Sequence, residues 1–201
     1  MSNFKQYALK LLELRDFVAL RRHLEKASND ERQLADEIYL LSLIKQDISS
    51  SALEHPFDNY LEKYGASVPK SNLVTAARIK FELAKFDEAL DLLSKNEVPR
   101  EEIEATEIAV LCLFNLKRYE PGKALVDYLL SVHEDRLIYH EWNILFSFKV
   151  GDLQGVLESW EQHDFSSYQF TQRVSVLGFV IRSVQKSKPL KKILQDRYLV
   201  K

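Results

Sequence analysis

A short motif returns along this chain at intervals of about 34 residues, and it constrains the fold more than any other feature. Each copy has a polar turn, one large apolar residue and then a helical run of apolar residues; the clearest copy reads KFDEALDLL. The large residue recurs with spacings of 31, 38, 33, 34 and 37 residues, at Phe17, Ile48, Phe86, Tyr119, Leu153 and Leu190. A period in this range is typical of stacked helical hairpins. One hairpin cannot bury its own apolar face, so we expect the stacked array to be the folding unit.

The composition favours an all-α chain. Gly and Pro occur five times each in 201 residues, whereas Leu, Glu, Lys and Ala, which favour helices, dominate. Apolar spacing predicts helix pairs at 3–14 and 17–26, 31–45 and a segment ending near 63, 72–84 and 87–94, 101–116 and 121–133, 137–149 and 153–162, and 169–184 and 190–198. We therefore expect one domain over residues 1–201, a right-handed α-solenoid of five to six antiparallel helical hairpins with a basic C-terminal capping helix at about 188–201.

The second helix pair is irregular. Its segment DISSSALEHPFDNYLEKYGASVPKS carries three consecutive serines, Pro56 and Gly65. Proline is unfavourable inside a helix, so we expect the second helix of this pair to be broken or to follow a loop. Two interpretations stay open, a longer connection and a loop that contacts a partner.

The residues of the first pair resemble the tetratricopeptide repeat family. Matches to the small, large and turn positions of that family occur at Ala8, Leu11, Phe17, Leu24 and Ala27 in the first pair, at Phe86 and Ala89, at Tyr119 and Ala124 after a displacement of two residues, and at Gly151 and Asp152. The resemblance covers most of the chain, with Leu20 and Val156 in place of the family's alanine. It implies a concave groove, lined largely by the first helix of each pair, that holds a peptide or a neighbouring subunit.

No pattern typical of catalysis or of cofactor binding stands out. None of the five histidines belongs to a His-x-x-x-His pair or lies beside a cysteine ligand. No glycine-rich loop precedes a helix, so no phosphate site is indicated. The single cysteine, Cys112, lies in an apolar run and is expected to be a small buried residue. We therefore expect a protein that is not an enzyme and that uses no cofactor and no metal ion.

The sequence also bears on location. No segment has the roughly 18 uncharged apolar residues of a membrane span, and the N-terminal MSNFKQYALKLLELRDF is expected to form an amphipathic structural helix rather than a signal peptide. One cysteine fits a reducing compartment. We expect a cytoplasmic protein, with the nucleus as the alternative.

Charge is unevenly distributed. Residues 171–201 hold eight Lys or Arg and one acid, a net charge of +7, whereas the whole chain carries −2 and the other 170 residues therefore −9. Three interpretations of the basic end stay open: a solvated cap of the array, a docking site for an acidic protein, and contact with nucleic acid or an anionic membrane.

These observations predict a scaffold or adaptor subunit that binds a protein segment or packs against larger subunits of a complex. The alternative is a helical-repeat protein that binds nucleic acid through its basic end. The expected protein contacts lie on first helices or in the basic cluster, at Arg78, Glu107, Trp142, Arg173, Lys191 and Lys192. Trp142 has a second interpretation as a core residue, because buried tryptophans are common in helical cores.

Overall fold

The computed structural model describes residues 3–96, residue 98 and residues 101–162. The chain divides into two compact units, residues 1–98 and 99–201. The first unit contains α1 (Asn3–Glu13), α2 (Phe17–Leu24), α3 (Arg32–Lys45), α4 (Ser50–Tyr64), α5 (Lys70–Glu82) and α6 (Phe86–Lys95). The described part of the second unit contains α7 (Ile103–Asn115), α8 (Tyr119–Val132), α9 (Leu137–Val150) and α10 (Leu153–Gln162). No strand occurs in these ranges, so the all-α prediction is confirmed.

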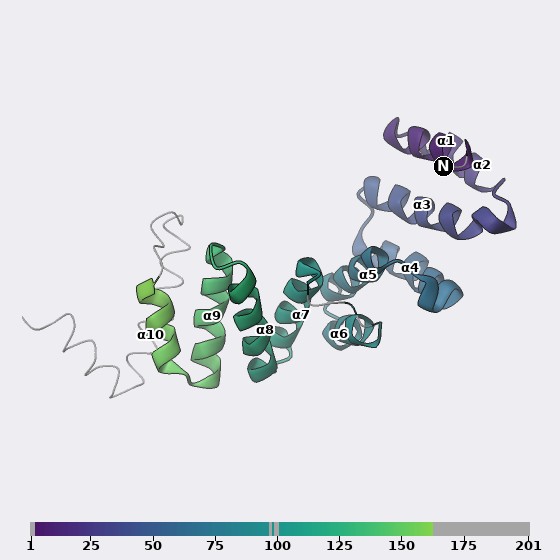
Figure 1. Cartoon of the computed structure of the whole chain (residues 1–201). Coiled ribbons are helices and arrows are strands. Elements are labelled where there is room, and N and C mark those ends of the chain that lie inside the picture. Colours follow the sequence, from purple (N-terminus) through teal and green to yellow (C-terminus); the bar gives the residue numbers. More distant parts are fainter. Residues whose placement is uncertain (1–2, 97, 99–100, 163–201) are drawn as a thin grey trace, which may run out of the picture. The chain divides into compact units, whose positions relative to one another are not determined.

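Within each unit, every helix packs against the helix that follows it (Figure 1). In the first unit α1 also contacts α3, and the short 3-10 segments Asn29–Glu31 and Gly65–Ser67 lie in the connections before α3 and after α4. The expected helices at 169–184 and 190–198, and with them the basic capping helix, lie outside the described residues.

A left-handed residue follows the first helix of each described hairpin. These residues are Arg15, Asp47, Ala84, Lys117 and Gly151, with φ angles of 55°, 53°, 59°, 59° and 84°. In three hairpins the next residue donates its N–H to a carbonyl five residues earlier, from Asp16 to Leu11, from Lys85 to Lys80 and from Arg118 to Leu113. This is the Schellman arrangement, which satisfies the free carbonyls at a helix end.

The left-handed turn explains why the large apolar residue is a reliable marker. Phe17, Phe86, Tyr119 and Leu153 each begin the second helix of their hairpin, two residues after the left-handed residue. In the second hairpin the aligned residue is Ile48, and α4 begins two residues after it, at Ser50. Four of the five left-handed residues are not glycine, so glycine alone could not have located these turns.

The predicted break in the second hairpin is wrong. Helix α4 is continuous from Ser50 to Tyr64 with Pro56 inside it, and no long loop precedes it. A proline costs a helix interior about 3 kcal/mol. Leu53, Phe57 and Tyr60 of the same helix are all buried, and burying a large side chain contributes roughly 1.5–3 kcal/mol. Burial of this one helix face therefore outweighs the cost of the proline.

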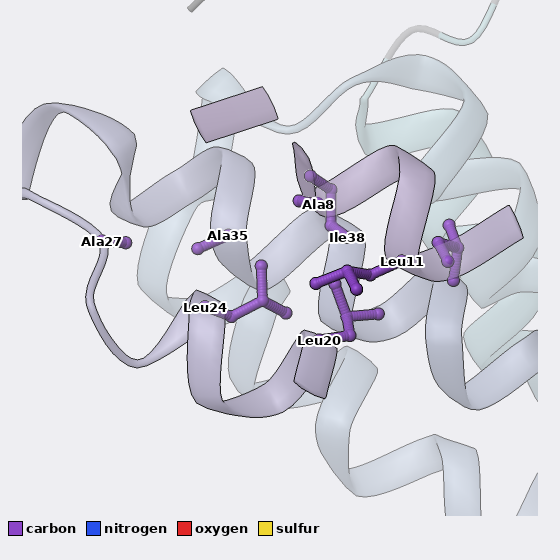
Figure 2. Close-up of a cluster of buried hydrophobic side chains, with 8 residues drawn as sticks. Ala8, Leu11, Leu20, Leu24, Ala27, Ala35 and Ile38 are labelled. Atoms are coloured by element: carbon purple, nitrogen blue, oxygen red, sulfur yellow. The ribbon is translucent and has the colours of Figure 1, made fainter. Parts of the chain in front are cut away.

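The residues that carry the family resemblance in the first hairpin lie together. Figure 2 shows Ala8, Leu11, Leu24 and Ala27 in one buried cluster with Ala35 and Ile38 of the following helix. Phe17 packs against the same cluster from its edge. Small residues at Ala8 and Ala35 allow the helix backbones to approach closely, and the larger side chains fill the space beside them.

Equivalent positions are buried in every described hairpin. The residue seven places before the left-handed residue is buried each time, at Ala8, Leu40, Ala77, Val110 and Ile144. In the second helices Leu20, Ala89, Gly122 and Val156 occupy one buried position, three residues after the helix start. Ala124, matched above by a displacement of two residues, is exposed, and Gly122 takes its expected place.

Candidate functional site

Two of the predicted contact residues are Glu107 on α7 and Trp142 on α9. Both contact Tyr139 of α9, which was not among the predicted residues. The Tyr139 hydroxyl donates a hydrogen bond of 2.6 Å to Glu107 Oε1. The Arg136 guanidinium donates to the Tyr139 hydroxyl at 3.0 Å and to Glu107 Oε1 at 3.3 Å. The Trp142 ring lies against the Tyr139 ring, with 5.6 Å between centroids.

This arrangement holds α7 to α9. Tyr139 is fully buried, and its burial, with the adjacent Glu107 carboxylate, raises the pKa of its hydroxyl. The phenol therefore remains a hydrogen-bond donor at neutral pH. Trp142 packs against a cluster of buried residues that includes Val126, Leu129 and Phe146. The Glu107 carboxylate is already occupied by two donors, which makes its main role structural.

Tyr139 was missed by sequence reasoning, although a signal was present. Glu107 and Tyr139 are 32 residues apart, close to the repeat period. Residues separated by one period lie on the first helices of neighbouring hairpins. A hydrogen-bond donor and an acceptor at that spacing can therefore meet when the helices stack. Of the other predicted contacts, Arg78 is exposed on α5 in the first unit, while Arg173, Lys191 and Lys192 lie outside the described residues.

A surface that the sequence analysis did not select lies on the flank of α3 around Tyr39. The Tyr39 side chain, 39% exposed, lines three adjoining cavities of about 520, 400 and 210 Å³. The largest is bounded by α2 and α3, and the second by α3 and α4. We call this surface the Tyr39 groove. Two of its three cavities fall in the range of roughly 300–1,000 Å³ seen for ligand sites.

The α2 side of the Tyr39 groove is apolar with a charged edge. Val18 is 66% exposed there, and Phe17 and Leu43 lie beside it in the lining. Arg21 and Arg22 also line the cavity, and Arg21 forms an exposed ion pair of 3.7 Å with Glu25. An exposed pair of this kind contributes little stability, so its charges remain available to a ligand.

The α4 side of the groove is held by hydrogen bonds to α3. Asp36 accepts from Lys63 Nζ and from the Tyr64 hydroxyl, each at 2.7 Å. The Tyr60 hydroxyl donates to Glu37 at 2.7 Å, and burial together with this carboxylate raises the pKa of Tyr60 to about 12. These bonds fix the α4 wall and neutralise Asp36.

A buried lysine joins α4, α5 and α6 on another side of α4. Lys80, 8% exposed, lies 2.8 Å from Glu54, 2.8 Å from Asp58 and 3.2 Å from Glu88. Lys85 also binds Glu54, at 2.8 Å. We call these five residues the Lys80 cluster. At the equivalent position, four residues before the left-handed residue, α1, α3 and α7 carry leucines.

The charge state of the Lys80 cluster indicates a structural role. Burial lowers the pKa of Lys80, but hydrogen bonds to the three carboxylates outweigh it and leave the pKa raised. Hydrogen bonds from Lys80 and Lys85 lower the pKa of Glu54. A lysine that acts as a base or nucleophile needs a lowered pKa, so this lysine is an ion-pair partner.

The described residues contain no cluster of three or more His, Cys, Asp or Glu suited to a metal ion. Cys112 is buried, as predicted. Within the same ranges, none of the helices combines the length and apolar character needed to cross a membrane.

Comparison with family models, with curated proteins and with solved structures finds no match for this chain.

Proposed function

We propose that this protein is a scaffold or adaptor without enzymatic activity, built as a tetratricopeptide-like, right-handed α-solenoid. It binds a segment of a partner protein in the Tyr39 groove and thereby joins a larger complex. The Tyr39 groove is the observation that carries this proposal, because it exposes an aromatic side chain between two helical walls. Tyrosine is enriched at protein interfaces, where its ring supplies contact area and its hydroxyl a polar contact.

The form of the groove favours a protein segment over a small ligand. Its three cavities adjoin along one flank rather than forming one enclosed chamber, and all three are lined by Tyr39. Exposed aliphatic surface at Val18 lies beside charged side chains, which is the combination of apolar centre and polar rim found at protein interfaces. The proposal therefore rests on α2, α3 and α4 rather than on Glu107 and Trp142, which already bind Tyr139. Nucleic-acid binding by the basic end remains the alternative predicted from charge.

Site-specific photo-crosslinking tests this function. A photoreactive phenylalanine analogue at position 39, in the full chain expressed in its native cells, should form discrete adducts with one protein. Tyr7 is the matched control position, since it is an exposed tyrosine on α1 that lines none of the three cavities. Adducts at position 39 and not at position 7 support the proposal. Equal adducts at both positions, or none at position 39, contradict it.

A further inference from the structure

We infer that the segment bound in the Tyr39 groove is acidic and carries an aliphatic or aromatic anchor residue. This inference rests on the proposed function and adds the chemistry of the partner. It follows from the charges that line the groove, from their existing partners and from the apolar surface between them.

The charged lining of the groove has an excess of cations. Its three cavities are lined by four permanently charged cations and two anions, namely Arg21, Arg22, Arg32, Lys63, Glu25 and Asp36. The first 100 residues carry fifteen Lys or Arg and sixteen acids. A local net charge of +2 in a nearly neutral part of the chain is therefore a property of this surface. Such a surface attracts acidic segments and disfavours basic ones.

Each anion of the groove has a cation beside it, whereas part of the cationic charge has no carboxylate partner within the described residues. Asp36 binds Lys63 and Tyr64, and Glu25 pairs with Arg21. Within the described part of the chain, the Arg22 side chain forms no hydrogen bond or ion pair, and it is exposed on α2. Its guanidinium has five N–H donors that suit a carboxylate. Arg32 donates to the Ala27 carbonyl at 3.0 Å and keeps further donors free of that bond.

The anchor follows from the apolar part of the lining. Val18, Tyr39 and Leu43 face the largest cavity with the ring of Phe17. A nucleic-acid backbone would match the arginines but would leave this aliphatic surface unused. A peptide with carboxylates near Arg22 and one large apolar side chain beside Tyr39 uses both features.

Selection from a displayed library of random dodecapeptides on the full-length protein tests the inference. We expect the enriched peptides to carry several Asp or Glu and one Leu, Ile, Phe or Trp. Arg22→Glu should weaken their binding about tenfold, and raising the salt concentration should weaken it further. Lys10→Glu is the matched control, because Lys10 and Arg22 both lie in the last turn of an exposed helix end. That control should change affinity less than twofold, as for an exposed charge outside the interface.

The outcomes separate the inference from the proposed function. Acidic peptides that lose affinity with Arg22→Glu and with Tyr39→Ser support both. Peptides that are neutral or basic, and that still require Tyr39, overturn the acidic partner and leave the groove as a protein site. A selection that yields no peptide dependent on Tyr39 overturns both. A single-stranded oligonucleotide that binds in place of peptides, and requires Arg22, assigns the groove to nucleic acid and also overturns the inference. Circular dichroism of each variant verifies that it is folded.

Discussion

The same position of the repeat is exposed beside cavities on α3 and is bonded to the next helix on α9. We call the first flank open and the second closed. Tyr39 on α3 and Asn143 on α9 each lie eight residues before the left-handed residue of their hairpin. Asn143 donates a hydrogen bond of 2.7 Å to Ser159 on α10, and Ser159 is buried. Tyr39 is exposed beside cavities that reach both α2 and α4. The short amide on α9 binds the next helix, whereas the tyrosine on α3 stays exposed beside a groove.

The closed packing of the second unit is tightest where α8 meets α9, so we expect the largest effect there. A Cβ added at Gly122 would overlap the Phe146 ring, with 2.7 Å to its Cζ. Phe146 is buried against Phe114 and Tyr119 and cannot turn away. Gly122→Ala should destabilise the protein by about 2–3 kcal/mol, measured by urea denaturation.

A glycine that lies close to a movable side chain provides the control. A Cβ at Gly155 would meet the exposed carboxylate of Asp152, so Gly155→Ala should be much less destabilising than Gly122→Ala. Phe146→Leu should recover part of the stability of Gly122→Ala, since it removes the obstructing ring. Equal losses for the two alanine variants would show that the α8–α9 contact is not unusually tight.

The Lys80 cluster closes the side of α4 away from the Tyr39 groove, and its loss should have the next largest effect. Lys80→Ala leaves three carboxylates without their shared cation. We expect a loss of about 2 kcal/mol, less than the 3–5 kcal/mol of a fully buried pair because Asp58 and Glu88 are half exposed. Lys80→Met, which keeps the volume and resembles the leucines of α1 and α7, should cost less. A larger loss for Lys80→Met than for Lys80→Ala would contradict this account.

The same cluster predicts a pH dependence. The pKa of Glu54 lies below its ordinary 4.5, so its contribution to stability is present above that value and is lost as the pH falls through the folded-state pKa. The pKa of Lys80 lies above its ordinary 10.5, so its contribution is lost only as the pH rises beyond that value. The difference in unfolding free energy between wild type and Lys80→Met should therefore be constant between these limits and shrink below about pH 4.5. A difference that stays unchanged in acid would exclude the carboxylates as its cause.

The open and closed flanks can be compared directly by truncating the equivalent residues. Asn143→Ala removes the bond to Ser159 and leaves a buried hydroxyl without its partner, at a cost of about 1–2 kcal/mol. Tyr39→Ala removes an exposed side chain and should cost about 0.5 kcal/mol or less. Thermal and urea unfolding of the two variants measure this contrast. Similar losses would mean that Tyr39 supports the fold rather than lining a free groove.

Substitutions in the turns should have smaller effects than the loss of the contacts between helices. Ala84 adopts φ 59°, which is strained for a residue with a Cβ, whereas Gly151 adopts φ 84° without such strain. Ala84→Gly should stabilise the protein by about 0.5–1 kcal/mol, and Gly151→Ala should destabilise it by about 1 kcal/mol. Changes of the same sign in the two variants would show that the turns are not equivalent.

Much of the helical pattern could be predicted from sequence because apolar residues recur at helical spacing and each turn is followed by a large apolar residue. Leu153 thus marked its helix start to the residue, whereas α8 begins at Tyr119, two residues before the predicted start at 121. Helix α4 was mispredicted because Pro56 is visible in the sequence, whereas the burial of Phe57 and Tyr60 that offsets it depends on neighbouring helices.

The Tyr39 groove could not be predicted, since apolar periodicity identifies the buried face of one helix and not the gap between two. The same periodicity placed Glu107 and Trp142 on first helices, but their shared partner Tyr139 required the stacking of α7 on α9.

The Lys80 cluster affects which hairpins pair with each other during folding. Hairpins that follow one pattern resemble each other, and pairing between the wrong units is a characteristic failure of repeat proteins. Helix α4 offers Lys80 two carboxylates four residues apart, at Glu54 and Asp58. Against another helix the ammonium would lose those two partners and keep only Glu88 of its own hairpin, at a cost of up to about 2 kcal/mol. The charge of Lys80 therefore favours packing of the third hairpin against the second hairpin rather than against another one.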